Sequence, residues 1–501
     1  MNKKERRVLL LGVDAGDPTL IRDWANAGQL PFFQELERNS AIFPVKNDVG
    51  FFVGSVWPSY ATGKTPDQHH WYCYRQYDPG SYHDIPFDPS MLQAEPFWGE
   101  LSRQGIRVGV IDVPLLPVAS GIDGFQVSEW GSHDTFLGGL KTWPADLADD
   151  IREKFGPDPV GTCDDIARTP GGFTQFVASL EQRISTRERM IAALCKRYAP
   201  DFLFAVLSES HCAGHQAWHL HDAGHPRHDA ELTQRIGDPL LRIYKAIDAS
   251  ARRIVDRWKN AHVLVLLSHG MGPHYGISYM LDAVLERLDH QPVSREKRIW
   301  GRAQSVWQAT PDWIKRHLPP TQSIRAGLKD ALMSRGRQRR RFFAVSNNDV
   351  YGAIRINLLG REPRGCVTQS EFPALIDWLK ENLLALRCSE TGEPVALEVV
   401  FTPDLYGGPF LEQMPDLLIR WNQSLPIESV SLPDGGQLRL AYRGARTGDH
   451  RGEGVGRLYY LGGSQAGAHD PARNIDIAPT VAALLNISIA SLPGKVIGGI
   501  L

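Results

Sequence analysis

Short apolar runs recur along the first half of the chain and alternate with stretches of helical periodicity. Four runs, each rich in Val, Ile, Leu or Phe, cover residues 8–13, 107–113, 201–207 and 262–267. Such runs are typical of buried strands in a parallel sheet. The helical stretches between them cover residues 18–37, 176–198 and 239–259. This alternation predicts an α/β fold, with helices on both faces of a parallel sheet and ligands at the carboxyl ends of the strands.

The alternation of strands and helices stops near residue 280. Residues 280–341 have a helical pattern and end in an arginine-rich run, 335–341, which we interpret as a solvated loop rather than an anion site. Strand-like patterns resume at residues 351–358, 396–401 and 416–421. We therefore predict a first part of the core at 1–279, a helical insertion or lid at 280–345, and a second part of the core at 346–501.

The composition is that of an ordinary globular chain and argues against several kinds of partner. The 501 residues are 42% hydrophobic and carry a formal net charge of −2, so we expect no nucleic acid polymer and no anionic membrane as main partner. No run approaches the roughly 18 apolar residues of a membrane span, and the apolar run near the N-terminus is too short for a secretory signal. The six cysteines include no C-x-x-C pair, which predicts a reducing cytoplasm and no zinc ribbon. The oligomeric state is not predicted.

Three segments carry histidines in positions suited to a ligand. His211 and His215 follow a strand-like run four residues apart, so a helical turn would point both at one ion. Gly214 between them lets another backbone pass close by. His269 ends another run, and His450 lies in a polar loop bounded by glycines. Taken singly, each is equally compatible with a surface or turn histidine, because the chain contains 17 of them.

Two further residues suggest chemistry near the N-terminus. Asp14 closes the first apolar run, where a carboxylate is costly to bury unless it meets a metal or a base. Asp17, before a proline, is a candidate helix cap. Ser55 is predicted as the N-cap of a helix that has Pro58 in its first turn. A hydroxyl at a helix start beside cations would be an activated nucleophile, although a capping role alone is the alternative.

Six elements of the sequence follow one another in a recognisable order. They are Gly12-Val-Asp-Ala-Gly-Asp17, Trp57-Pro-Ser-Tyr-Ala-Thr-Gly63 with Pro66 and His69, Glu209-Ser-His-Cys-Ala-Gly-His215, Ser268-His-Gly-Met271, His450, and Asp476-Ile-Ala-Pro-Thr480. Together they resemble the type I phosphodiesterase/nucleotide pyrophosphatase branch of the alkaline phosphatase superfamily. The resemblance covers most of the chain outside the helical insertion. It implies an alkaline-phosphatase-like parallel sheet core flanked by helices.

The resemblance also implies a metal-dependent hydrolase of phosphate esters, acting on a small-molecule substrate. It implies two divalent metal ions. Zinc is the metal expected, and manganese is the alternative. One ion would be held by His211, His215 and His450. The other would be held by Asp14, Ser55 and His269. The Ser55 hydroxyl would attack phosphorus in line, and metal-activated water would hydrolyse the resulting phospho-enzyme.

Three departures from the family pattern bear on this assignment. Ser268 stands where the family has an aspartate, so the second ion loses a carboxylate unless Asp17 or another acid compensates. His211 also replaces an aspartate, which gives the first ion three neutral imidazoles, as in zinc hydroxide sites. Val56 occupies the usual nucleophile position, so Ser55 is the nearest hydroxyl at the expected helix start, with Ser59 as the second candidate.

Three further polar residues are candidate substrate contacts: Glu209, His133 and Arg355. His133 lies in a polar patch after a strand, for which a structural turn is the alternative reading. Arg355 can meet a substrate anion or pair with an acid of the core. The alternatives to a phosphodiesterase are a phosphomonoesterase or sulfatase-like hydrolase of the same superfamily, and a degenerate metal-binding protein without turnover.

Overall fold

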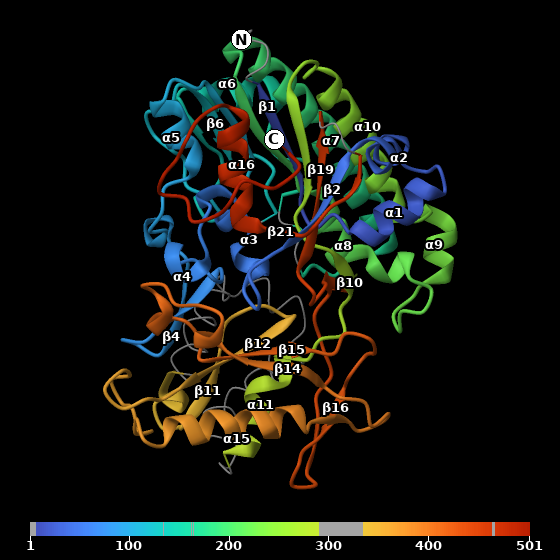
Figure 1. Cartoon of the computed structure of the whole chain (residues 1–501). Helices are drawn as coiled ribbons and strands as arrows, with labels where there is room; N and C mark the ends of the chain where they lie inside the picture. Colours follow the sequence, from blue (N-terminus) through green and yellow to red (C-terminus); the bar gives the residue numbers. More distant parts are fainter. Residues whose placement is uncertain are drawn as a thin grey trace, which may run out of the picture. The chain divides into compact units, whose positions relative to one another are not determined.

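The chain divides into two compact units, which we describe separately. The computed structural model describes residues 7–133, 135–161, 163, 165–289, 334–462 and 466–500. Unit 1 comprises residues 1–71, 88–274 and 443–501, and unit 2 comprises residues 72–87 and 275–442 (Figure 1). These bounds differ from the divisions that we predicted at 279/280 and 345/346. Residues 290–333 of the predicted insertion lie outside the described residues, so the insertion stays a prediction.

Unit 1 is built on one mixed sheet whose central strands are parallel. Among the described residues the strand order is β20-β2-β19-β9-β1-β8-β5-β6-β7, with β21 also paired to β2. The strands are Val8–Val13 (β1), Ala41–Lys46 (β2), Val108–Ile111 (β5), Gly124–Ser128 (β6), Lys141–Trp143 (β7), Phe202–Leu207 (β8), His262–Leu267 (β9), Val455–Leu461 (β19), Gly467–Ala468 (β20) and Ala472–Arg473 (β21). β1 runs parallel to β8 and β9, whereas β19 runs antiparallel to β2 and β9. The four predicted strands are β1, β5, β8 and β9, and the predicted α/β class is confirmed.

The side chains of strand β1 belong to two core clusters, one on each face of the sheet. All six of its residues are buried, and successive side chains point to opposite faces of the sheet. Leu9 and Val13 belong to one core cluster and Leu10 to the other. The helices of the first cluster are Pro18–Asn26 (α1), Pro31–Asn39 (α2), Leu147–Phe155 (α6), Pro170–Tyr198 (α7), Glu209–His221 (α8) and Pro239–Asp256 (α10). Those of the second are Phe52–Thr62 (α3), Phe97–Arg103 (α5) and Ile477–Leu484 (α16).

The single helix predicted over residues 18–37 is two helices, so that prediction was wrong. Gly28, with a φ of +71°, takes a left-handed conformation after α1. Pro31 then begins α2, where a residue without an N–H is tolerated at the first helical position. Asp17 caps α1 as predicted, because its Oδ1 accepts the backbone N–H groups of Thr19 and Leu20 at 3.0 and 2.8 Å.

Unit 2 contains a four-stranded antiparallel sheet in the order β11-β12-β15-β14. Its strands are Phe342–Val345 (β11), Tyr351–Ile356 (β12), Ala396–Phe401 (β14) and Leu417–Trp421 (β15). Helices Leu281–Leu288 (α11) and Phe372–Leu384 (α15) share one apolar core with this sheet. The strand patterns predicted at 351–358, 396–401 and 416–421 correspond to β12, β14 and β15.

The arginine-rich run at 335–341 is not the solvated loop that we predicted. Arg337 is 6% exposed and its guanidinium binds the Asp84 carboxylate at 2.7 and 3.1 Å. Arg340 is 7% exposed and binds Asp282 at 2.7 Å. Asp84 is 253 residues from Arg337 in the sequence, and Asp282 is 58 residues from Arg340. No local sequence pattern therefore predicts these ion pairs.

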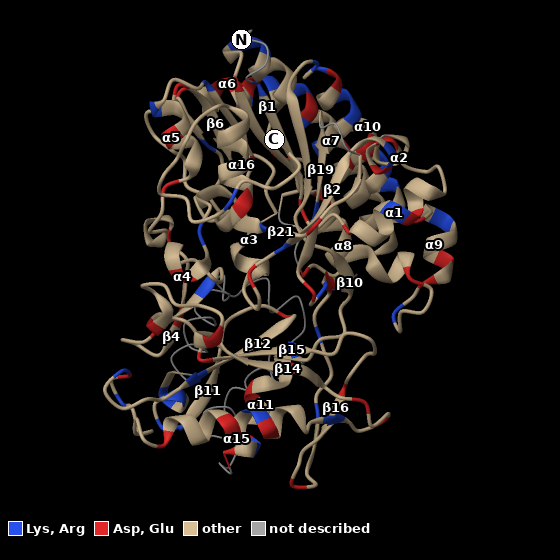
Figure 2. Ribbon diagram, viewed as in Figure 1, with Lys and Arg blue, Asp and Glu red and all other residues tan. Residues whose placement is uncertain are grey.

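The distribution of charge agrees with the near-neutral composition. Figure 2 shows that basic and acidic residues alternate along the helices of unit 1 rather than gathering by sign. Within the described residues, no helix is long and apolar enough to cross a membrane.

Candidate active site

The ends of three neighbouring strands in unit 1 bring a carboxylate and three histidines together. Asp14 directly follows β1, and His269 follows β9 by two residues. His211 and His215 lie on α8, which begins two residues after β8. β8, β1 and β9 are adjacent parallel strands, so their carboxyl ends meet at one edge of the sheet, as predicted.

His450 joins these residues from far along the chain. It ends the short strand β18 (Gly448–His450), which pairs with β10 (Met271–Pro273) immediately after His269. A Cβ on Gly448 would lie 2.2 Å from the Gly214 carbonyl oxygen, so α8 and β18 approach more closely than any side chain would allow. The glycine that permits this approach is Gly448, whereas a Cβ on Gly214, the glycine that we singled out, would meet the Met271 side chain at 2.6 Å. We call Asp14, His211, His215, His269 and His450 the histidine cluster.

The members of the histidine cluster are in direct contact. His211 Nδ1 lies 2.8 Å from Asp14 Oδ2, and its Nε2 lies 2.9 Å from His215 Nε2. The His450 ring centroid lies 4.9 Å from those of His211 and His215 and 4.4 Å from that of His269. The structure therefore brings together five of the six residues predicted as metal ligands.

The hydrogen bonds of His211 and His215 assign their protons. His215 Nδ1 lies 2.9 Å from the Gly448 carbonyl oxygen, which only accepts, so Nδ1 must carry the hydrogen. His211 Nδ1 must likewise donate to the Asp14 carboxylate. In neutral rings both Nε2 atoms then present lone pairs to each other at 2.9 Å. A shared proton or a metal cation between the two nitrogens satisfies both lone pairs, and imidazole Nε2 atoms are donors that zinc and similar ions bind.

Burial favours the neutral form of His215, His269 and His450, whereas contacts with neighbouring side chains keep the Asp14 carboxylate charged. Burial lowers the pKa of His269 to about 4 and holds those of His215 and His450 well below their usual value. For Asp14, burial alone would raise the pKa, but the charge and hydrogen bond of His211 outweigh it and the pKa falls below its usual value. His269 Nε2 is buried and has no hydrogen-bond partner among the described residues. The donor set at neutral pH therefore fits a divalent metal ion.

Two residues beside the cluster extend the donor set. His215 and His450 form a group with Asp449 in which one ligand atom from each lies within 4.8 Å of the others, and His133, His211 and His215 form another. The His133 ring stacks on that of His211, with centroids 4.1 Å apart. We predicted His133 as a substrate contact. Asp449 was missed, although its position directly before His450 was the available signal.

Helix α3 differs from the prediction at Ser55. It begins at Phe52, three residues before Ser55, so Ser55 is not the N-cap and Pro58 lies inside the helix. Ser55 is buried, and its Oγ donates to the Phe51 carbonyl at 2.9 Å. The α3 side chain that reaches the cluster is Trp57, whose Nε1 donates to Asp14 Oδ1 at 2.8 Å. The structure thus shows no hydrogen bond between the described atoms of Ser55 and the cluster.

Ser268 occupies the place of the family's second aspartate. Its Oγ lies 2.8 Å from His269 Nδ1 and 3.3 Å from Asp14 Oδ1, so it links two members of the cluster without adding charge. Asp17 does not supply the missing carboxylate, because its Oδ2 accepts from Arg451 Nε at 2.7 Å and from the Met271 amide at 3.1 Å.

The other two predicted substrate contacts lie in ion pairs. Glu209 is fully buried in unit 1, and its Oε1 accepts from Arg183 at 2.9 Å and from Arg187. Arg355 is buried in unit 2, where its Nε donates to Glu362 at 2.7 Å. Arg355 therefore pairs with an acid of the core, which was the alternative to a substrate contact. Glu209 likewise forms an internal ion pair and is not exposed to a substrate.

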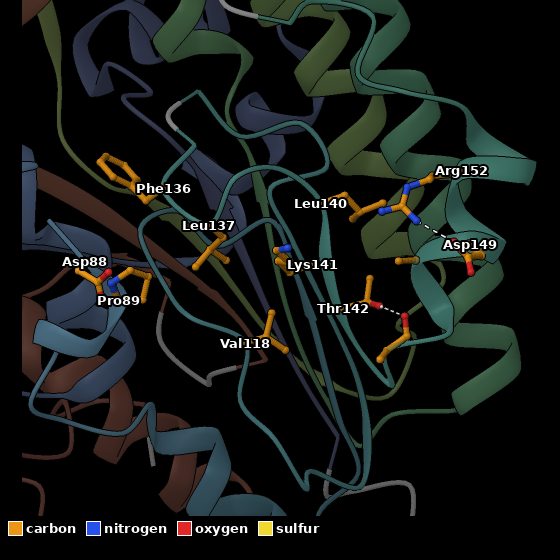
Figure 3. A pocket seen from close by; sticks show the side chains of 12 residues that line it. Asp88, Pro89, Val118, Phe136, Leu137, Leu140, Lys141, Thr142, Asp149 and Arg152 are labelled. Carbon is orange, nitrogen blue, oxygen red and sulfur yellow. Dashed lines mark hydrogen bonds and ion pairs between the residues drawn. The ribbon is translucent and has the colours of Figure 1, made fainter. Parts of the chain in front are cut away.

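Unit 1 also has a hollow of about 660 Å³ whose lining residues include no member of the histidine cluster (Figure 3). Two of its polar side chains are engaged locally. Arg152 pairs with Asp149 at 2.7 Å, and the Thr142 hydroxyl donates to the Pro144 carbonyl at 2.7 Å. We assign this hollow no ligand.

The mixed sheet, its two helical layers and the polar edge at the strand ends define an alkaline-phosphatase-like hydrolase fold. The profile of the family described as type I phosphodiesterase / nucleotide pyrophosphatase matches residues 8–393. The chain belongs to this family of phosphoester hydrolases, as the resemblance predicted.

One solved hydrolase shares the fold of this chain at low sequence identity. Phosphonoacetate hydrolase from Sinorhizobium meliloti 1021, in complex with phosphonoacetate, is 13% identical with a TM-score of 0.55, covering 96% of each chain. Its complex with phosphonoformate gives 15% identity and a TM-score of 0.52 over 96% of each chain. Murine ectonucleotide pyrophosphatase/phosphodiesterase 5 gives 12% identity and a TM-score of 0.47, over 98% of this chain and 97% of that one. No curated protein sequence matches the chain.

Proposed function

We propose that this phosphoester hydrolase is metal-dependent, acts on phosphate diesters, and uses the histidine cluster as its metal site. One observation carries the proposal: the Nε2 atoms of His211 and His215 face each other at 2.9 Å with both Nδ1 atoms bound to oxygen acceptors. Because both Nδ1 hydrogens are given to oxygen acceptors, the two Nε2 atoms can meet only through an additional proton or a bound cation, and the second of these supports the proposal.

The proposed ligand sets are those that the family resemblance implies. His211, His215 and His450 would hold one zinc ion, and Asp14 and His269 would contribute to a second, weaker site with Ser55. Such ions supply electrophilic stabilisation of the phosphoryl group and acidify the attacking hydroxyl or water. The loss of a carboxylate at Ser268 supports unequal affinity, because the second set has fewer anionic donors.

The chain's own residues orient these ligands. Gly448 fixes the His215 ring through its carbonyl, and Trp57 and Ser268 both donate to Oδ1 of the Asp14 carboxylate. Contacts of this kind set the tautomer and direction of a ligating side chain. The start of α3 lies nearby, since the Phe52 ring is in edge contact with His269 at 5.6 Å. A helix start favours anions, which supports a phosphoryl group at this position.

Ser55 stays our proposed nucleophile, although its hydroxyl is engaged in a hydrogen bond within α3. Its Oγ now donates to the Phe51 carbonyl, so the hydroxyl must give up this hydrogen bond and its proton before it can attack. Replacing Ser55 by alanine is expected to lower kcat for a diester on the order of 10³-fold or more, by removing the covalent route. Steady-state kinetics of the fully metallated variant measures this loss.

A hydroxyl on the same helix provides the control. Thr62 Oγ1 donates to the Pro58 carbonyl at 2.7 Å, the same contact four residues back that Ser55 makes. Thr62→Val removes that hydroxyl and should leave kcat unchanged. If Ser55→Ala kept the wild-type rate, serine would be excluded as the nucleophile and direct attack by water would take its place.

The choice between diesters and monoesters is tested by comparing two chromogenic substrates. We expect the zinc-loaded protein to hydrolyse bis-p-nitrophenyl phosphate with a higher kcat/KM than p-nitrophenyl phosphate. A reversed preference would make the protein a phosphomonoesterase. Hydrolysis of neither ester by fully metallated protein would contradict the proposed function.

A further inference from the structure

Two thiols and an imidazole form a second cluster beside the histidine cluster. Cys212 lies on α8 next to His211, Cys163 precedes α7, and His133 follows β6. His133 Nδ1 lies 3.0 Å from Cys163 Sγ and 3.4 Å from Cys212 Sγ, and the two sulfurs are 3.1 Å apart. All three side chains are buried. The proposed hydrolysis uses neither sulfur.

The geometry points to a Cys₂His site that binds one thiophilic divalent ion, such as zinc. Zinc bonds of about 2.3 Å to sulfur and about 2.0–2.1 Å to nitrogen place ligand atoms roughly 3.5–3.8 Å apart on a tetrahedral ion. The observed separations of 3.0–3.4 Å are smaller by less than about 1 Å. Small side-chain rotations would therefore admit the ion. Sulfur donors select soft ions over magnesium or calcium.

The surroundings of the sulfurs suit a ligating pair. Arg183 Nη2 donates to Cys212 Sγ at 3.0 Å, an outer hydrogen bond of the kind that holds a metal ligand in place. The charge of Arg183 is itself balanced, because its Nε binds Glu209 at 2.9 Å and its Nη1 binds Asp158 at 3.2 Å. Two thiolates and one divalent ion have no net charge, so the buried site needs no further counter-ion.

The new site would be coupled to the hydrolytic one through His133. The His133 ring stacks on His211 with a centroid distance of 4.1 Å and an interplanar angle of 28°. An ion bound to His133 Nδ1 would hold this ring in place and thereby fix the neighbouring face of His211. We therefore assign the site a positioning role, distinct from contact with substrate.

Cobalt(II) titration of the full-length, reduced and metal-stripped protein tests the site without reference to ester turnover. A thiolate–cobalt charge-transfer band in the near ultraviolet should grow to a plateau at one equivalent per Cys₂His site. Cys163→Ser should lose the band and one equivalent of metal. The matched control Cys195→Ser, on α7 and outside the cluster, should keep both. His215→Ala should keep the band while losing the metal of the histidine cluster, which separates this proposal from the proposed function.

Three results would overturn the Cys₂His site. The first is the absence of a thiolate band from the reduced wild-type protein, which needs no variant to interpret. The second is a band of full intensity in Cys163→Ser. The third is recovery of a disulfide-linked Cys163–Cys212 peptide from protein alkylated at lysis, because such a bond would consume both ligands.

Discussion

Replacing His215 by alanine is expected to remove the metal from the histidine cluster and to reduce kcat/KM on the order of 10³-fold or more. The His215 side chain is in hydrogen-bond contact with the Gly448 carbonyl, and its Nε2 faces that of His211 at 2.9 Å. Its loss removes one of three imidazoles and leaves the Nε2 of His211 without its opposing donor. Elemental analysis and diester kinetics on the same preparation measure both effects.

A histidine on the same helix serves as the matched control for this prediction. His221 pairs with Asp238 at 2.7 Å and takes no part in the histidine cluster. His221→Ala should retain wild-type metal content and kcat/KM. A His215→Ala variant that keeps both its metal and its activity would show that the cluster is structural.

Replacing Glu209 by alanine is expected to destabilise unit 1 by about 3–5 kcal/mol, because it leaves two arginines buried without their shared carboxylate. Arg183 and Arg187 are fully buried and both bind Glu209 Oε1. Asp158 and Asp112 would still pair with one arginine each, so the loss should not remove the fold. The thermal unfolding midpoint and a denaturant titration measure the effect.

The control is an ion pair of similar chemistry at the surface. Glu181 binds Arg242 at 2.6 Å with a third of its side chain exposed, and Glu181→Ala should change stability by less than about 1 kcal/mol. Folded Glu209→Ala should keep the wild-type KM. An unchanged unfolding midpoint together with a raised KM would instead restore Glu209 as a substrate contact.

The elements that carry the site were predictable because their signals are local. A continuous apolar run such as 8–13 identifies a strand that is buried on both faces of a parallel sheet. The carboxyl ends of parallel strands lie at one edge of the sheet, so Asp14 and the histidines that follow β8 and β9 are expected there. The His211–His215 spacing of four residues also reads directly as one helical face. The family motifs added His450, whose strand pairing with β10 no local pattern indicates.

The features that escaped prediction depend on partners distant in sequence. Glu209 is a charged residue within a motif that resembles the family's site, which suggested a substrate contact. Its partners Arg183 and Arg187 lie 26 and 22 residues upstream on α7. Arg337 pairs with an acid 253 residues away. The prediction that Ser55 caps α3 was wrong for another reason. The helix begins at Phe52 without a side-chain cap, so the preference of serine for the N-cap position placed the predicted helix start too late in the sequence.

The most direct test of the account is a zinc titration of metal-stripped protein, followed by turnover of bis-p-nitrophenyl phosphate. We predict negligible turnover by the stripped protein and recovery as zinc is added. The same titration of His215→Ala should give no recovery. Full turnover by protein shown to be free of metal, or none by protein shown to be fully loaded, would contradict the claim that the histidine cluster is the metal site of a phosphoester hydrolase.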